Sequence, residues 1–123
     1  MTDSKIVKKI LSFKTIAVVG MSPNPVRPSH YVSLYLQDHG YKIIPVNPSQ
    51  TEIIELKCYS SLLEIKEKVD IVNVFRRSEY VNSIAQETLQ IKAKALWLQD
   101  NVISLEAKKL AEKNNLLFIM NDK

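Results

Sequence analysis

The feature that most constrains this fold is a set of five short runs of aliphatic residues, spread along the whole chain. Most of these runs are hydrophobic at nearly every position, instead of alternating apolar with polar residues. Strands of that kind are buried on both faces, as in parallel sheets that are covered by helices. We therefore predict five mainly parallel strands, at residues 15–20, 42–46, 69–75, 95–98 and 116–120.

Segments of helical period separate these strands. Apolar residues recur at spacings of three and four after the first, third and fourth runs, whereas a short turn at 61–65 separates the second from the third. Residues 1–13 are expected to add an amphipathic helix, centred on 3–12, that packs on the sheet. The alternation predicts an α/β fold, a Rossmann-like doubly wound sheet with helices on both faces.

Pro45 conflicts with the second strand. Proline lacks the N–H that a sheet ladder uses, and it is normally confined to edge strands or strand ends. Two accommodations are open from the sequence: the strand effectively starts near Val46, or a local bulge surrounds the proline.

Length and composition set the broad class of protein. A chain of 123 residues suits one domain over residues 1–123, and its longest apolar run is five residues, against about 20 for a membrane span. The amino terminus lacks an apolar signal segment, so we expect a cytoplasmic protein without a membrane partner. The net charge of +4 comes without interleaved basic and aromatic residues, which argues against nucleic acid. This positive charge is consistent with binding of an anionic small molecule, and equally with a charge that serves only solubility.

The loop after the first strand is the main candidate for a binding site. It connects a buried strand to a helix, where backbone amides and the helix dipole favour a pyrophosphate. One glycine and three prolines replace a Gly-x-Gly-x-x-Gly fingerprint, so side chains would supply the donors. A rigid proline-rich turn without a ligand explains the same residues equally well. The candidates are Gly20, Ser22, Asn24, Arg27, Ser29 and His30.

The other strand ends add candidates of different chemistry. The second strand ends in Asn47 and Pro48, without the Asp or Glu that holds the ribose in NAD-binding folds. This absence disfavours NAD strongly and NADP less strongly. Phe75 and Arg76 follow the third strand, and Gln99 follows the fourth.

Catalytic and metal chemistry find little support in the sequence. The two histidines, His30 and His39, lie nine positions apart on one predicted helix, which is too far for a shared metal. Cys58 has no second thiol and no histidine near it in the sequence. We therefore expect no catalytic residues and no metal site.

Five short blocks of sequence, in a fixed order, carry a family resemblance. They are Gly20-Met21-Ser22-Pro23-Asn24-Pro25, Pro45-Val46-Asn47-Pro48, Cys58-Tyr59-Ser60-Ser61-Leu62, Phe75-Arg76-Arg77 and Trp97-Leu98-Gln99. Together they resemble the small bacterial CoA-binding protein family. The resemblance spans roughly residues 13–122. This family is similar to the CoA-binding amino-terminal domain of the succinyl-CoA synthetase alpha subunit, without the following domain that carries the phosphorylated histidine.

The resemblance implies a Rossmann-like domain that holds the ADP part of coenzyme A across the strand ends. It implies a pyrophosphate site at the first helix, which Ser22, Arg27 and Ser29 would supply. An adenosine pocket would lie near residues 47–48. Further residues would line the continuing groove, from which the pantetheine arm emerges: Phe75, Arg76 and Gln99.

The expected function is binding of coenzyme A or acyl-CoA by a carrier, sensor or regulatory protein without catalytic activity of its own. One alternative is a dissociated subunit of an acyl-CoA ligase, completed by an unidentified protein partner. Another is a generic NADP or nucleotide binder. A third is an interaction module that has lost its ligand. Asp100 favours the third, because it replaces a glycine that many family members have, and an acidic side chain beside a polyanion weakens binding.

Overall fold

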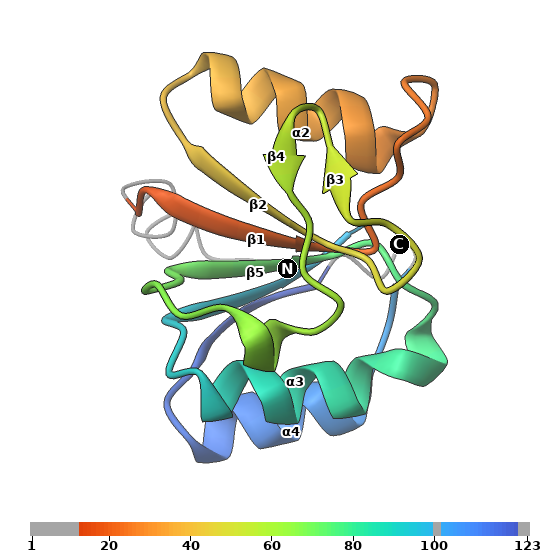
Figure 1. The fold of residues 1–123 in the computed structure, drawn as a ribbon. Coiled ribbons are helices and arrows are strands. Elements are labelled where there is room, and N and C mark those ends of the chain that lie inside the picture. The colour runs from red at the N-terminus through yellow and green to blue at the C-terminus, as the bar shows by residue number, and fades with distance from the viewer. Residues whose placement is uncertain (1–12, 100–101, 121–123) are drawn as a thin grey trace.

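Five strands form one parallel sheet, in the order β2-β1-β5-β6-β7 (Figure 1). The computed structural model describes residues 13–99 and 102–120. Each pair of neighbouring strands is parallel, and every residue of β5 is buried. The prediction of five parallel strands is confirmed. Their bounds are Thr15–Val19 (β1), Lys42–Val46 (β2), Ile71–Val74 (β5), Ala95–Leu98 (β6) and Leu117–Ile119 (β7).

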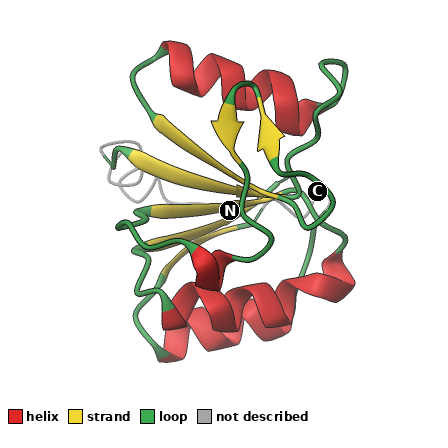
Figure 2. Cartoon of the chain, viewed as in Figure 1, coloured by secondary structure: helices red, strands yellow, loops and turns green. Residues whose placement is uncertain are grey.

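Helices cover both faces of the sheet, as predicted (Figures 1 and 2). Helix α2 (Pro28–Asp38) lies on one face, where Leu36 packs against a core cluster that contains Val18. Helices α3 (Val81–Gln90) and α4 (Leu105–Lys113) lie on the other face, where Ile84 and Ala111 pack against a second cluster. The predicted helix within residues 1–13 falls almost wholly outside the described residues. In the described part of the chain, no helix is long and apolar enough to span a membrane.

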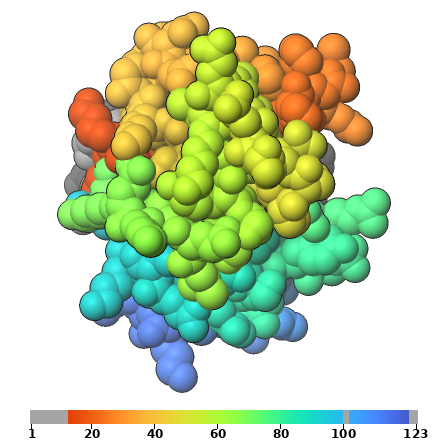
Figure 3. Space-filling view, viewed as in Figure 1, coloured from red at the N-terminus to blue at the C-terminus, as the bar shows by residue number. Residues whose placement is uncertain are grey.

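A small hairpin that the sequence did not predict follows β2. It consists of β3 (Glu52–Ile53) and β4 (Leu56–Lys57), which are too short to show a hydrophobic period. The chain then returns through the 3-10 turn η1 (Leu62–Glu64) to β5. In Figure 3 this yellow-green segment runs over the front of the molecule. It brings residues 58–62 to the carboxyl end of β2, because Val46 forms a bridge with Tyr59.

Pro45 sits inside a regular strand, so both accommodations expected from the sequence are wrong. Strand β2 runs from Lys42 through Val46, and Pro45 is paired with Val18 in the ordinary parallel register. The physical reason is that β2 is the edge strand of the five-stranded sheet. The carbonyl of Pro45 faces outward and accepts a hydrogen bond from the Tyr59 amide at 3.0 Å. The proline nitrogen shares that side, so the ladder with β1 loses no donor.

The Asp70 carboxylate fastens the amino-terminal end of the sheet. One of its oxygens accepts hydrogen bonds from the amides of Lys14 and Thr15, at 3.0 and 3.1 Å, and Lys94 Nζ lies 3.7 Å from the other oxygen. Burial alone would raise the pKa of this carboxyl. The two amides and the neighbouring lysine charges outweigh burial and hold the pKa below its ordinary value.

This lowered pKa predicts an acid-sensitive contribution to stability. A carboxylate whose pKa is lower in the folded state stabilises the fold above its unfolded pKa, and the contribution is lost as the pH falls. We expect Asp70→Asn to lower the free energy of unfolding at pH 7 by about 1 kcal/mol. The variant should also lose less stability on acidification than the wild type. Urea denaturation between pH 7 and about pH 3 measures both effects, with the exposed Asp38→Asn as control. An equal pH dependence in Asp70→Asn and wild type would contradict this assignment.

Candidate functional site

A cavity of about 160 Å³ opens at the carboxyl edge of the sheet. Its walls come from the ends of β1 and β2, from residues 60–62 and from the first turns of α3. Three residues expected at the site line this cavity, namely Gly20, Pro48 and Arg76. The position agrees with the general rule that doubly wound sheets bind ligands beyond their carboxyl ends, where the strand order reverses.

The loop between β1 and α2 is built by hydrogen bonds from its backbone to its own side chains. The Ser22 amide donates to Ser29 Oγ at 2.9 Å, and the Asn24 amide donates to Ser22 Oγ at 3.0 Å. The Val26 amide donates to Asn24 Oδ1 at 3.1 Å. Ser22, Asn24 and Ser29 therefore hold the loop in shape, and a ligand contact by their hydroxyl or amide groups stays a prediction.

His30 fixes the same loop from the first turn of α2. Its ring is buried, and Nδ1 lies 2.9 Å from the Ser22 carbonyl oxygen. A carbonyl oxygen can only accept, so Nδ1 carries the hydrogen in this contact and donates it. The contact that the structure gives to His30 is therefore with the loop, and the predicted contact with a phosphate stays a prediction.

The amino-terminal end of α2 lies beside an exposed arginine. Arg27 is the N-cap residue and is exposed, Pro28 follows it, and no side chain caps the helix at this position. The first turn contains no acidic residue. Aligned peptide dipoles place positive potential at such a helix end, and a guanidinium group adds a forked donor for phosphate oxygens.

Asn47 ties the ends of β1 and β2 together. Its Nδ2 donates to the Met21 carbonyl at 2.9 Å, while its Oδ1 accepts from both the amide and the hydroxyl of Ser49. The neutral amide group serves both needs, since it combines a donor with an acceptor. A carboxylate here would lose the donor to Met21. Asn47 thus shapes the crevice beside Pro48.

Gly20 lets Arg76 lie across the end of β1. Gly20 has φ +87°, and a Cβ atom added to it would come within 2.9 Å of Arg76 Cδ and 3.1 Å of the Phe75 carbonyl oxygen. The Arg76 guanidinium carbon lies 4.5 Å from the centre of the Tyr80 ring, a cation-π contact. The close approach of these two chain segments needs a residue without a side chain.

Phe75 and Gln99 lie on the other face of the sheet. Phe75 packs against the core cluster on the α2 side, and Gln99 Nε2 donates to Asn73 Oδ1. Asn73 is buried in the middle of the sheet, so this hydrogen bond satisfies an otherwise costly polar group. The expected site residues therefore divide into a cavity group, a loop group and this pair. Asp100 falls outside the described residues.

Sequence reasoning missed five polar or aromatic residues that line the cavity. Ser60 and Ser61 belong to a block noted only for its family resemblance, and they reach the cavity because the β3–β4 hairpin carries them there. The other three recur at spacings of three and four residues: Tyr80 directly precedes α3, and Ser83 and Glu87 lie on one side of that helix. That spacing was the available signal.

Cys58 is buried beside the crevice, and its thiol is poorly suited to act as a nucleophile. Its Sγ lies 3.5 Å from the Asn47 carbonyl oxygen. Burial raises the pKa of this thiol, and the contact with Asn47 lowers it by a smaller amount. A thiol with a raised pKa is a poor nucleophile near neutral pH. Within residues 13–99 and 102–120, no group of three His, Cys, Asp or Glu side chains could hold a metal ion.

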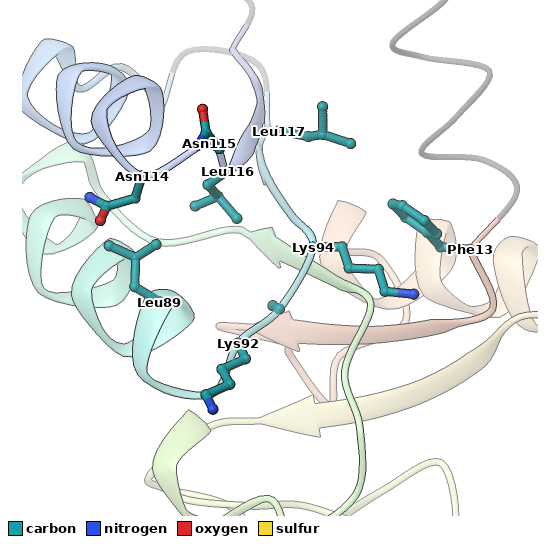
Figure 4. A pocket seen from close by; sticks show the side chains of 9 residues that line it. Phe13, Leu89, Lys92, Lys94, Asn114, Asn115, Leu116 and Leu117 are labelled. Carbon is teal, nitrogen blue, oxygen red and sulfur yellow. The ribbon is translucent and has the colours of Figure 1, made fainter.

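A larger cavity, of about 730 Å³, lies at the opposite, amino-terminal edge of the sheet. Its lining includes Lys92, Lys94 and Asn114, whose polar ends point in different directions in Figure 4. Lys94 Nζ is 3.7 Å from the Asp70 carboxylate and 5.2 Å from the centre of the Phe13 ring. The polar groups do not converge on a common point, so this cavity lacks the arrangement of a built binding site.

Comparison with known proteins finds a matching family and several similar chains. Residues 14–122 match the family described as CoA binding domain. The chain is 46% identical over 116 residues to the uncharacterized protein YneT of Bacillus subtilis, covering 94% of this chain and 86% of YneT. It is 34% identical over 101 residues to the ADP-forming acetate-CoA ligase II of Archaeoglobus fulgidus, covering 80% of this chain and 15% of the ligase. The structure of a hypothetical protein from Pyrococcus horikoshii OT3 superposes with a TM-score of 0.92 at 36% identity, covering 98% of this chain and 85% of that chain.

The two glycines of the chain offer a matched test of the crevice. Both have positive φ, but only Gly20 has neighbours within 4 Å of an added Cβ. We expect Gly40→Ala to cost about 1 kcal/mol of stability, the penalty of a side chain at positive φ. Gly20→Ala should cost more, because Arg76 and the Phe75 carbonyl must also shift. Thermal denaturation of both variants measures the difference, and equal losses would show that the close approach to Arg76 carries no energy.

Proposed function

Because this chain belongs to the CoA-binding domain family, we propose that it binds coenzyme A or an acyl-CoA through the ADP moiety, at the carboxyl edge of its sheet. The observation that carries this proposal is the combination of two cationic features with one cavity at that edge. Arg27 stands at the amino-terminal end of α2, and Arg76 lines the cavity. Gly20 connects the two, since it begins the loop and its missing side chain leaves room for Arg76.

The proposed pyrophosphate site is the amino-terminal end of α2. The helix dipole and the Arg27 guanidinium both favour negative charge there, and the first turn has no acidic side chain to oppose it. Hydrogen bonds among Ser22, Asn24 and Ser29 already hold the loop in shape, so little conformational freedom is lost when a ligand binds.

The neutral side chain of Asn47 supports CoA over NAD. Coenzyme A carries a 3′-phosphate on its ribose, and a carboxylate at the end of β2 would repel it. Asn47 is neutral and donates to the Met21 carbonyl. The position therefore lacks the acidic residue that holds the ribose hydroxyls in NAD-binding folds.

The proposed role is that of a carrier, sensor or regulator in the cytoplasm, without catalysis by this chain. His30 and Cys58, the side chains most suited to covalent or acid-base chemistry, are buried and engaged with backbone carbonyl oxygens. The chain also spans about 15% of the length of the acetate-CoA ligase that it matches. The remaining 85% of that ligase has no counterpart in this match.

A second candidate function follows from the same comparison. The chain would be the CoA-binding subunit of an acyl-CoA ligase, completed by a protein partner. The match to the Archaeoglobus fulgidus ligase favours it. Affinity purification of the tagged protein from its own cells, followed by an assay for ADP-forming acyl-CoA synthesis, separates the two. A co-purifying partner that confers this activity would establish the subunit role.

Calorimetric titration with coenzyme A, 3′-dephospho-CoA and NADP, at two salt concentrations, tests the primary proposal. We expect coenzyme A to bind most tightly, more weakly at high salt because phosphate contacts are screened. Equal binding of NADP would favour a generic nucleotide binder. No binding of any of the three would reject the proposal for the isolated chain and direct attention to the partner.

The same titration measures the predicted effect of Arg27→Ala. Loss of a charge-assisted phosphate contact should weaken coenzyme A binding by about 1.5 to 3 kcal/mol, roughly 10- to 150-fold. The matched control is Arg77→Ala, because Arg77 is also exposed but is paired with Glu79 at 3.8 Å, outside the cavity lining. An unchanged affinity in Arg27→Ala would remove this residue from the site.

A further inference from the structure

The cavity at the carboxyl edge combines apolar walls with one acidic side chain. Val19, Val46 and Leu62 form part of its wall, and Glu87 of α3 lines it as a half-buried residue. A carboxylate in such a place needs hydrogen-bond donors, because a partly desolvated charge is costly without them. The hydroxyl of Ser61 donates to Glu87 Oε1 at 3.3 Å. This is a long hydrogen bond, and a carboxylate has room for several.

The serine hydroxyls that line the cavity already have partners. Ser60 Oγ donates to Glu64 and Ser83 Oγ donates to the Tyr80 carbonyl oxygen, while Ser61 Oγ accepts from the Leu63 amide at 3.1 Å and donates to Glu87. Glu87 is thus a charged acceptor in the cavity with room for a further donor. An ionised carboxylate accepts hydrogen bonds and cannot donate them.

The charge of Glu87 restricts which part of a ligand can enter. A phosphate group beside a half-buried carboxylate is repelled, so the entering group must be uncharged and must carry an N–H or O–H donor. Coenzyme A has three such parts: the adenine base, the ribose 2′-hydroxyl and the pantetheine arm. The 2′-hydroxyl is next to the 3′-phosphate, which Glu87 would repel, so the base and the arm remain. The volume of about 160 Å³ is close to that of one planar bicyclic base, whereas the long arm needs an extended groove.

The mouth of the cavity also suits a planar group. The Arg76 guanidinium and the Tyr80 ring contact each other there, at 4.5 Å, and both line the cavity. Guanidinium and aromatic planes stack readily on nucleobases. A base that stacks on these planes would lie in the same cavity as Glu87 of α3.

We propose that Glu87 accepts a hydrogen bond from the exocyclic amino group of the adenine base of coenzyme A and thereby selects the base. This inference rests on the proposed function, and it adds a specificity residue to that site. Ser61 positions the Glu87 carboxylate from the opposite wall. The predicted contact involves a charged acceptor, which makes it stronger than a hydrogen bond between neutral groups.

The test compares coenzyme A with its analogue in which purine replaces adenine, so that only the amino group is missing. We expect wild-type protein to bind coenzyme A about 10-fold more tightly than the purine analogue, the effect of one charge-assisted hydrogen bond. Glu87→Ala should bind both ligands with equal affinity. Glu87→Gln keeps an acceptor without the charge, so it should retain a smaller preference. Glu112→Ala, which removes an exposed carboxylate on α4, is the matched control and should keep the full preference.

The outcomes separate this inference from the proposed function. Tight binding of both ligands by the wild type, with equal affinity, would overturn the role of Glu87 and leave coenzyme A binding intact. A preference that persists in Glu87→Ala would assign the amino group to another residue. Absence of coenzyme A binding by the wild type would overturn the proposed function and this inference with it. The wild-type comparison needs no variant, so it can overturn the role of Glu87 even if a substitution at position 87 impairs folding.

Discussion

The central position of β1 is the constraint on which the rest of this structure depends. β1 pairs with β2 on one side and with β5 on the other, and residues 16–19 are buried. The chain reaches β2 through α2 on one face of the sheet and reaches β6 through α3 on the other. The strand order therefore reverses between β1 and β5. The crevice at the carboxyl ends of these strands is a direct consequence of that topology.

Gly20 leaves the space in this crevice that Arg76 occupies. It ends β1 with a positive φ, and its missing side chain makes room for Arg76 at the end of β5. The following loop is held by Ser22, Asn24, Ser29 and His30, whose polar atoms bind the loop itself. Side chains that satisfy a loop internally make it rigid before any ligand arrives, which lowers the entropic cost of binding.

Much of the fold was predictable from the sequence, because buried parallel strands consist of continuous apolar residues. The strand at residues 42–46 was predicted correctly, but its proline looked anomalous. The position of β2 in the sheet was not visible in the sequence, and an edge strand tolerates Pro45 with its nitrogen directed outward. The β3–β4 hairpin was missed for a different reason, since strands of two residues have no measurable period.

The candidate site, like the fold, was predictable from the sequence only in part. By itself, the sequence determined the α/β class, the five strands and the loop after the first strand, because burial and chain direction act through local patterns. It also pointed to Gly20, Pro48 and Arg76, since these lie within two residues of a strand end. Only the tertiary structure decided that residues 60–61 and Glu87 share a cavity with them. Those residues come from segments far apart in the chain, and their meeting depends on which strand lies at the edge and how a short hairpin folds back over it.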